Sequence, residues 1–270
     1  EGSKYAPPAP KFTDAERHDE LAKRRSAVAE RMADNSIMVM FSAEPRIYTN
    51  DVDYVLRQEN NIYYLTALKQ ANLMLVIRKS GGKVTETVYL PKRNPQFETW
   101  NGKMYSNEDA VRLSGIRNIV DAKERPAFLE SLKNHSDKTI TKIYLLLPEG
   151  ETDNDGKREF RQEEAFSKTL TAYQIENSQP IFADLRHIKS PYEIKLLQHA
   201  VDITTEAHMR SWATAGSLAM EYEVQAEVEY TFRRRNADYW GYPSIVGCGP
   251  NATTLHYEES QGPVTKGALL

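Results

Sequence analysis

The chain has 270 residues, of which 40% are hydrophobic and 27% are charged, proportions typical of a folded protein with one large domain or two ordinary ones. Its 35 basic and 38 acidic residues leave a net charge of -3, which gives no electrostatic reason to expect nucleic-acid binding. No apolar run approaches the roughly 20 residues of a membrane-spanning helix, so a membrane protein is not expected. Cys248 is the only cysteine, which excludes an intrachain disulfide and a thiolate metal cluster.

Residues 1–12 are predicted to form an extended leader ahead of the first domain. The stretch Tyr5–Pro10 is rich in proline, which stiffens an extended backbone. The chain begins with Glu1 rather than methionine and has no signal-like apolar core, so we expect a mature, trimmed or tagged product. Because such a leader often follows a removed secretory signal, the sequence leaves open whether this soluble protein is cytoplasmic or exported to the periplasm.

Alternating helices and strands predict an α/β domain over residues 13–183. Thr13 is expected to cap a helix that runs to about Ala33, with Glu16 at the capping-box position. The short apolar run Ile37–Ser42 predicts a buried strand. Later segments predict strands at 62–65, 73–77, 87–90, 116–120 and 139–147, and helices at 107–113, 125–133 and 160–172.

Turn signals separate some of these elements. Ser80-Gly81-Gly82 predicts a hairpin between the strands at 73–77 and 87–90. The polar stretch from Pro148 to Gly156 predicts a surface loop of the same domain, because helical periodicity resumes at Phe160. The domain boundary is therefore placed near residue 184.

Residues 184–270 are predicted to begin a second domain with two helices. Ser190-Pro191-Tyr192-Glu193 combines an N-cap serine, a proline at the first helical position and a capping-box glutamate. An apolar stripe follows, before Gly216 ends the helix: Ile194, Leu197, Val201, Thr205 and His208. A second helix is predicted from about Met220 to Arg235. Its last turn holds Arg233–Arg235, which suit the negative end of the helix dipole, with an anion site as the alternative.

The most informative segment is Gly241–Tyr257, which places a histidine after an apolar run. Three glycines allow close backbone approach in this segment: Gly241, Gly247 and Gly249. Ser244–Val246 is strand-like, and Asn251 is a turn former, so His256 is expected on a second extended piece over 253–257. Taken alone, His256 fits a loop between two strands that carries a surface or core histidine. Taken as a whole, the ordered run fits a resemblance to a known protein family better than it fits such a loop.

Other patterns in the sequence do not predict a catalytic site. There is no His-Glu-x-x-His phrase, and His199 and His208 are nine positions apart, which puts them on opposite helix faces. Glu223 and Glu227 share a helix face, and a solvated face explains them better than a metal site. No nucleophile-elbow phrase supports an acyl-enzyme hydrolase.

Three phrases, in order and across nearly the whole chain, resemble the proline-specific metallopeptidases of the aminopeptidase P and prolidase family. Residues 53–66 are similar to the Arg-Gln-x-x-x-x-x-Tyr-Leu-Thr phrase of its creatinase-type N-terminal domain. Residues 184–194 resemble the entry to its pita-bread domain, and residues 251–257 resemble its Asn-x-x-x-Leu-His-Tyr run. The resemblance implies a creatinase-type α/β domain with a mixed sheet over 13–183. The first part of an α+β pita-bread domain would follow over 184–270.

The resemblance also implies a site. Members of this family bind two divalent metal ions through two aspartates, one histidine and two glutamates, all downstream of the Leu-His-Tyr phrase. No metal ligand is therefore assigned to this chain, which we expect to end before them. Manganese is the expected metal, with zinc or cobalt as alternatives. By the same matching, His256 would be a catalytic histidine on the substrate side and Tyr242 a substrate-binding residue. An aromatic side chain packed before a proline turn explains Tyr242 nearly as well.

The function implied by the resemblance is metal-dependent hydrolysis of an N-terminal Xaa-Pro bond, completed by sequence beyond residue 270, so that this segment alone would be inactive. The alternatives are a non-hydrolysing protein-binding module, an Xaa-Pro dipeptidase and a creatinase-like hydrolase. The expected partners are a peptide with proline at its second position and further copies in a dimer or tetramer, or a separate C-terminal catalytic segment. Asn251 is expected to fix the turn before His256, and Cys248 to be a small buried residue.

Overall fold

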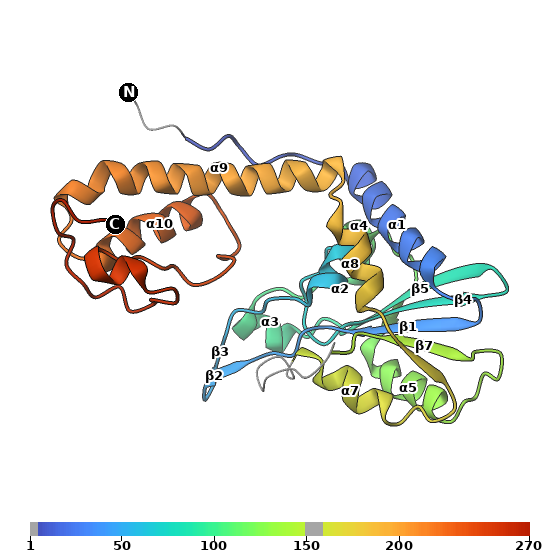
Figure 1. Cartoon of the computed structure of the whole chain (residues 1–270). Helices are drawn as coiled ribbons and strands as arrows, with labels where there is room; N and C mark the ends of the chain where they lie inside the picture. Colours follow the sequence, from blue (N-terminus) through green and yellow to red (C-terminus); the bar gives the residue numbers. More distant parts are fainter. Residues whose placement is uncertain (1–4, 149–158) are drawn as a thin grey trace. The chain divides into compact units, whose positions relative to one another are not determined.

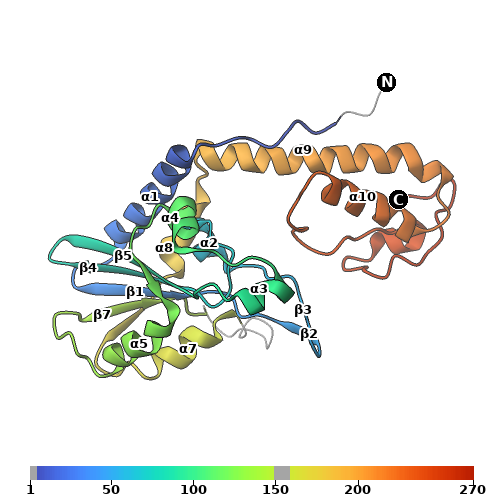
Figure 2. The same cartoon turned by 180° about the vertical axis from the view of Figure 1, so that it is seen from behind.

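The computed structural model describes residues 5–148 and 159–270. The first four residues, and all of the predicted loop at 148–156 except Pro148, lie outside the described part. The chain divides into two compact units, traced in Figures 1 and 2. One unit is Phe12–Ile188, and the other is Lys189–Leu270 together with the N-terminal residues up to Lys11. Residue 184, where the sequence placed the domain boundary, lies inside the last helix of the first unit.

The first unit is built on a six-stranded mixed sheet. Its strands are β1 (Ser36–Phe41), β4 (Met74–Ser80), β5 (Lys83–Leu90), β6 (Ile119–Asp121), β7 (Lys142–Leu145) and β8 (Gln174–Asn177). They lie in the order β6-β5-β4-β1-β7-β8, with β1 and β5 antiparallel to β4 and the other neighbours parallel. Gly81 and Gly82 join β4 to β5, and both have positive φ angles, as a two-residue type I′ turn requires. The predicted hairpin is confirmed.

Helices cover both faces of this sheet (Figures 1 and 2). They are α1 (Asp14–Arg31), α2 (Asn60–Thr66), α4 (Asn107–Ser114), α5 (Arg125–Lys133), α7 (Arg161–Ser167) and α8 (Gln179–His187). On one face, side chains of α1, α2, α4 and α8 share a hydrophobic cluster with Met38 and Leu75. On the other face, α5 and α7 pack with Ile37 and Val76. β1 is buried along its whole length because both of its faces are covered, so the predicted buried strand is confirmed.

Local signals in the sequence located several helices correctly. The capping box at Thr13 is present, with the hydroxyl accepting from the Glu16 N–H at 3.1 Å. Helix α4 ends at Gly115, which adopts the left-handed conformation of a helix C-cap. Helix α5 matches the range predicted for it.

The strand predicted at 62–65 is wrong, because these residues form helix α2. The side chain of Glu59 accepts hydrogen bonds from the Asn61 and Ile62 N–H groups and begins the helix. Ile62 and Leu65, three positions apart, are both buried against the sheet. Burial of this helical pair outweighs the strand preference of the aromatic and β-branched residues in the segment.

Other elements of the first unit differ in length or were not predicted. The strand expected at 116–120 begins only at Ile119, because β6 pairs with β5 over three residues. The strand expected at 139–147 is limited to β7, and the helix expected at 160–172 is limited to α7. Elements that the sequence did not predict are β2 (Ile47–Thr49), β3 (Val52–Asp53), β8, α3 (Pro95–Asn101) and α8, which lies where the sequence placed the passage to the second domain.

The second unit is organised by two helices, α9 (Pro191–Thr214) and α10 (Glu221–Arg234). The predicted capping box at Ser190 is present, with the serine hydroxyl accepting from the Glu193 N–H at 3.2 Å. Helix α9 gives way to a 3₁₀ turn, Ala215–Ser217, at the predicted glycine stop. The N-terminal leader also packs on this unit: the Ala6 N–H donates to Glu206 at 2.7 Å, and Arg235 forms an ion pair with the same carboxylate.

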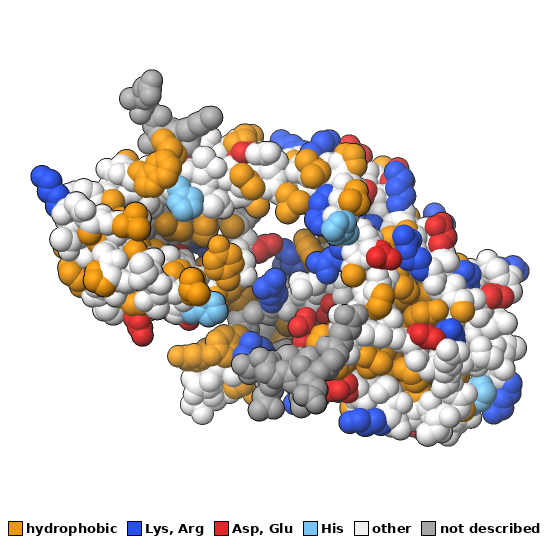
Figure 3. Space-filling view, in the orientation of Figure 1, with side chains coloured by type: hydrophobic (Ala, Val, Ile, Leu, Met, Phe, Trp, Pro, Cys, Tyr) orange, Lys and Arg blue, Asp and Glu red, His pale blue; other side chains and the backbone are white. Residues whose placement is uncertain are grey.

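The apolar stripe predicted on α9 lies on the surface. Ile194, Leu197 and Val201 are 53%, 48% and 56% exposed, and Trp212 farther along the same face is 72% exposed. The face of α9 that is buried carries Ile203, Glu206, Ala207 and Ser211 instead. Figure 3 shows hydrophobic side chains reaching the surface along α9.

The two extended pieces expected in the glycine-containing segment are absent. Residues 189–270, all of which the structure describes, contain no strand, and their only β pairing is an isolated bridge between Met220 and Pro263. Gly249–Thr253 forms a 3₁₀ turn in place of an extended run. A strand needs a partner for its N–H and C=O groups, and this unit offers none. In the described part of the chain, no helix combines the length and apolar character that a membrane span requires.

Candidate functional site

The segment Gly241–Tyr257 is anchored on helix α10 by one buried carboxylate, that of Glu221. Glu221 lies at the first position of α10, and its side chain is fully buried. Its Oε1 accepts from the Cys248 N–H at 2.6 Å and from the Asn251 side-chain amide at 3.1 Å. Its Oε2 accepts from the Tyr257 hydroxyl and from the Gly262 N–H, both at 2.7 Å.

These hydrogen bonds keep the Glu221 carboxylate charged. Burial alone would raise the pKa of Glu221, but the donors from Tyr257, Cys248, Asn251 and Gly262 outweigh it and lower the pKa to about 2. The hydrogen bond to this carboxylate also raises the pKa of the Tyr257 hydroxyl. The Glu221 carboxylate, a buried anion with four hydrogen-bond donors, therefore fixes the backbone around it, and we call it the hub of this segment.

Two glycines are required by the close packing around this hub. A Cβ atom at Gly247 would lie 2.7 Å from the backbone carbonyl of Asn251. At Gly262, it would lie 2.5 Å from the Asn251 side-chain nitrogen and 2.7 Å from Glu221 Oε1. At Gly247 the close atoms are backbone, so no side chain fits there, whereas a side chain at Gly262 would have to displace Asn251 and Glu221 from their hydrogen bonds.

Asn251 and Cys248 take part in the same arrangement. Asn251 lies in the 3₁₀ turn, and its side-chain amide donates to Glu221 and also, at 3.0 Å, to the Tyr257 hydroxyl. It therefore holds the turn through its side chain. Cys248 is buried, as predicted, and its Sγ accepts from the Thr265 N–H at 3.4 Å.

The two predicted site residues, Tyr242 and His256, both lie on the surface of the second unit. Tyr242 is 75% exposed, and His256 is exposed directly beside the buried Tyr257. Neither side chain belongs to the hydrogen-bond network of Glu221 as the described residues form it. Their roles toward a substrate stay predictions.

Sequence reasoning missed Glu221 as the organising residue. An acidic residue in the first turn of a helix is ordinary, and Glu223 two residues later does the ordinary task of capping, with its carboxylate accepting from the Ala219 and Met220 N–H groups. The signal that could have found Glu221 was the pair Gly247 and Gly262, one on each side of His256. Glycines that permit such close backbone approach indicate that another group packs tightly against this segment.

A second acidic side chain of α10 also holds the segment. The Ser244 hydroxyl, two residues beyond Tyr242, donates to Glu229 Oε1 at 2.9 Å. Glu227, which the sequence placed on a solvated face, forms an ion pair with Arg210 of α9 at 2.7 Å. Helix α10 therefore attaches to α9 through Glu227 and to the glycine-containing segment through Glu221 and Glu229.

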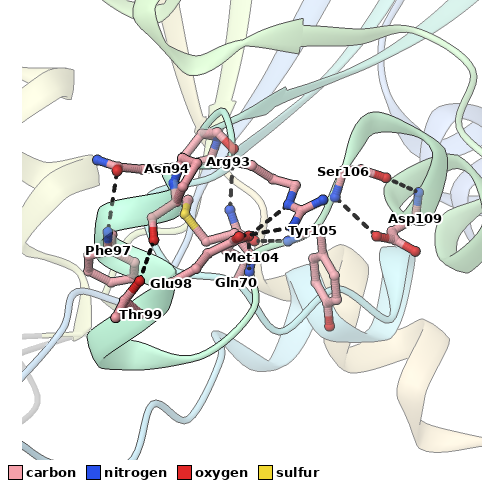
Figure 4. A network of polar contacts seen from close by, with 12 residues as sticks. Gln70, Arg93, Asn94, Phe97, Glu98, Thr99, Met104, Tyr105, Ser106 and Asp109 are labelled. Atoms are coloured by element: carbon pink, nitrogen blue, oxygen red, sulfur yellow. Dashed lines mark hydrogen bonds and ion pairs between the residues drawn. The ribbon is translucent and has the colours of Figure 1, made fainter.

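A second polar network lies around α3 in the first unit (Figure 4). Arg93 forms a bidentate ion pair with Glu98, at 2.7 and 2.8 Å, and the same carboxylate accepts from the Met104 N–H at 3.0 Å. Asn94 caps α3, and Gln70 accepts from the Tyr105 N–H at 2.7 Å. Each of these polar groups already has a partner, so the network fixes a loop and offers no chemistry of its own.

The residues described do not fit a two-metal centre. They contain no group of three or more His, Cys, Asp or Glu side chains placed to hold a metal ion.

Comparison with known proteins identifies the family. A model of the aminopeptidase P N-terminal domain matches residues 21–141, and a model of metallopeptidase family M24 matches residues 195–270. An Xaa-Pro aminopeptidase of Haemophilus influenzae is 31% identical over 252 residues, which cover 93% of this chain and 56% of that protein. Human Xaa-Pro aminopeptidase 3 is 25% identical over 92% of this chain and 48% of its own length.

Solved structures agree with this assignment. Aminopeptidase P from E. coli superposes with a TM-score of 0.79 at 25% identity, covering 96% of this chain and 58% of that one. Proline aminopeptidase P II from Yersinia pestis gives a TM-score of 0.76 at 25% identity, covering 93% of this chain and 58% of that one. The chain thus spans about half the length of the curated relatives it matches. The two family models follow one another in the order of these relatives, and the chain belongs to the aminopeptidase P family of metallopeptidases, whose peptidase domain has the pita-bread fold.

Proposed function

We propose that this chain is part of an Xaa-Pro aminopeptidase, an enzyme that hydrolyses the bond between an N-terminal residue and a following proline. The observation that carries the proposal is the Leu255-His256-Tyr257 phrase in the region matched by the metallopeptidase model, where Tyr257 is tied to the buried Glu221 and His256 faces outward. Two relatives that share this region are named Xaa-Pro aminopeptidase and Xaa-Pro aminopeptidase 3.

The proposed substrate has physical features that call for a dedicated site. The nitrogen of an Xaa-Pro bond has no N–H to donate, and the proline ring fixes φ, so recognition by strand pairing fails. Side chains must then bind the scissile group directly. His256 is exposed on an anchored loop, so its imidazole can donate to the carbonyl oxygen as negative charge develops there. Tyr242, exposed in the same segment, is proposed to contact the peptide.

The metal ions of this family are proposed to bind through residues outside these 270. Two divalent ions, manganese with zinc or cobalt as alternatives, would polarise the carbonyl and activate a water molecule. The described residues lack a ligand cluster, and the relatives extend well beyond the matched region, which supports this assignment. The ligands would come from a continuation of this chain or from a separate catalytic segment.

The exposed stripe on α9 supports the presence of a further protein part. Ile194, Leu197 and Val201 are exposed on one face of a helix that matches the metallopeptidase model from residue 195 onward, and Trp212 is exposed farther along the same face. Large apolar side chains exposed together on one helix face are typical of a surface that other protein covers. We propose that the rest of the peptidase domain packs there. Assembly into a dimer or tetramer remains a separate proposal.

An activity assay tests the proposed function. The 270-residue chain and a protein that continues through the ligand-bearing region are each incubated with manganese and an Xaa-Pro peptide. A peptide with alanine in place of proline and a chelator serve as controls. We expect chelator-sensitive cleavage of the Xaa-Pro peptide by the longer protein only. Manganese-stimulated cleavage by the 270-residue chain would contradict the assignment of the ligands. Absence of cleavage by the longer protein would favour a protein-binding module, and cleavage of dipeptides alone would favour a dipeptidase.

A further inference from the structure

The donors that converge on Glu221 lie on both sides of His256 in the sequence. Cys248 and Asn251 precede the histidine, and Tyr257 and Gly262 follow it. One carboxylate therefore closes residues 248–262 into a loop, with His256 on its exposed part. The Gly262 carbonyl also accepts from the Glu221 N–H at 3.0 Å, which ties the end of the loop to the start of α10.

The chemistry of the hub requires a carboxylate. Each oxygen of Glu221 accepts from two donors, so four donors share two oxygens that carry no hydrogen. A glutamine of the same shape would place an NH₂ group where one oxygen stands, facing two donors. Two buried donors would then lose their acceptor, which is costlier than the loss of an exposed hydrogen bond.

We propose that Glu221 is a positioning residue, whose carboxylate fixes the loop 248–262 so that His256 is presented at one place on the surface. The part of the proposal that concerns the reaction rests on the proposed function. The part that concerns the loop can be tested on this chain alone.

Thiol labelling tests whether Glu221 holds the loop. Cys248 is the only cysteine, it is buried, and its N–H donates to Glu221, so its reaction with a thiol reagent reports opening of the loop. In Glu221→Gln, we expect labelling to become at least about tenfold faster, since the loss of one buried charged hydrogen bond has that effect and two donors lose their acceptor here. Glu227→Gln is the matched control, because Glu227 lies on the same helix and pairs with Arg210 of α9. Labelling in Glu221→Gln as slow as in the control would overturn the proposal.

A milder variant covers the case in which Glu221→Gln does not fold. Tyr257→Phe removes one of the four donors and keeps the aromatic ring. We expect faster labelling of Cys248 than in the wild type, by a smaller factor than in Glu221→Gln. A folded Tyr257→Phe protein with unchanged labelling would count against Glu221 as the hub.

A double-mutant cycle tests whether Glu221 acts through His256. In a preparation that cleaves an Xaa-Pro peptide, Glu221→Gln is expected to lower kcat/KM about tenfold. In the His256→Ala background, the same change should have no further effect. Equal losses in both backgrounds would show that Glu221 has a general structural role and would overturn positioning. If the wild-type protein has no Xaa-Pro activity, the proposed function fails, and the labelling result still decides the role of Glu221 in the loop.

Discussion

Glu163 of the first unit and Glu221 of the second are both buried, and their carboxyl groups behave in opposite ways. Glu163 of the first unit is 2% exposed; one oxygen accepts from the Phe41 N–H at 3.3 Å, and the other has no hydrogen-bond partner among the described residues. Burial, with smaller contributions from nearby Glu59 and Glu44, raises its pKa to about 8. Glu221 of the second unit is also buried from solvent, and four donors lower its pKa to about 2. The pKa of each carboxylate therefore follows from two opposing causes, the desolvation that burial imposes and the number of donors that reach it.

This difference extends to the units as a whole. Both large hydrophobic clusters of the described chain belong to the first unit, where helices cover the two faces of the sheet. A neutral carboxyl group is tolerated in such a core. The second unit has a smaller apolar interior and exposes the stripe on α9, and buried carboxylates hold its segments together. Packing stabilises the first unit, whereas charged hydrogen bonds organise the second.

The largest expected effect is a loss of stability confined to the first unit. Leu75→Ala removes a fully buried side chain of the central strand β4 and should cost about 2–5 kcal/mol in free energy of unfolding. In the 270-residue chain, Leu197→Ala, the same change on the exposed stripe of α9, should cost less than about 0.5 kcal/mol. Denaturant unfolding of the two variants of this chain measures both. Similar losses would contradict the comparison, because they would mean that Leu197 is buried in this chain.

The next-largest expected effect is a loss of activity without a loss of stability. His256→Ala should lower kcat/KM on an Xaa-Pro peptide by about 10- to 1000-fold, the range for one positioned donor, in a protein that has the activity. The melting temperature should not change, because His256 is exposed. His208→Ala, at an exposed histidine of α9, is the control and should leave kcat/KM unchanged. Wild-type turnover by His256→Ala would remove this histidine from the mechanism.

The sequence correctly predicted local features, whose structure depends only on a few neighbouring residues. The capping boxes at Thr13 and Ser190 and the Gly81-Gly82 turn need only their immediate neighbours, and all three are present. The failures depend on distant partners. The strand-like run Ser244–Val246 lacks a strand to pair with in this unit, and the role of Glu221 depends on residues 27 to 41 positions away. For the same reason, the family phrases could point to His256 but not to the residue that holds its loop.

A pH titration sharpens the comparison of the two glutamates. The pKa of Glu163 is higher in the folded state, about 8, than its ordinary value of 4.5, so the folded protein binds more protons between these values. Stability of the first unit should therefore fall as the pH rises from about 4.5 to 8. Glu163→Gln should remove this dependence and gain roughly 1–3 kcal/mol at pH 8. Denaturant unfolding at several pH values measures it.

Glu164→Gln, on the same helix, is the control for this titration and should keep the wild-type profile. If Glu163→Gln still loses stability over that range, another group titrates there. Glu59 would be the next candidate, because burial also raises its pKa. Glu221 should act in the opposite direction: its contribution is present above pH 4.5 and is lost as the pH falls toward 2.

The smallest expected effect is the loss of stability when the same kind of helix cap is removed from each unit. Thr13→Ala and Ser190→Ala each remove a capping hydroxyl from a complete capping box and should cost about 1 kcal/mol. Helix α1 packs against α2, α4 and α8, so faster hydrogen exchange in Thr13→Ala should stay in its first turn. Helix α9 packs mainly on α10, so exchange in Ser190→Ala should rise about fivefold along both helices. Exchange confined to the first turn of α9 would instead mean that the hydrogen bonds of Glu206 and Glu221 hold the second unit together independently of the helix end.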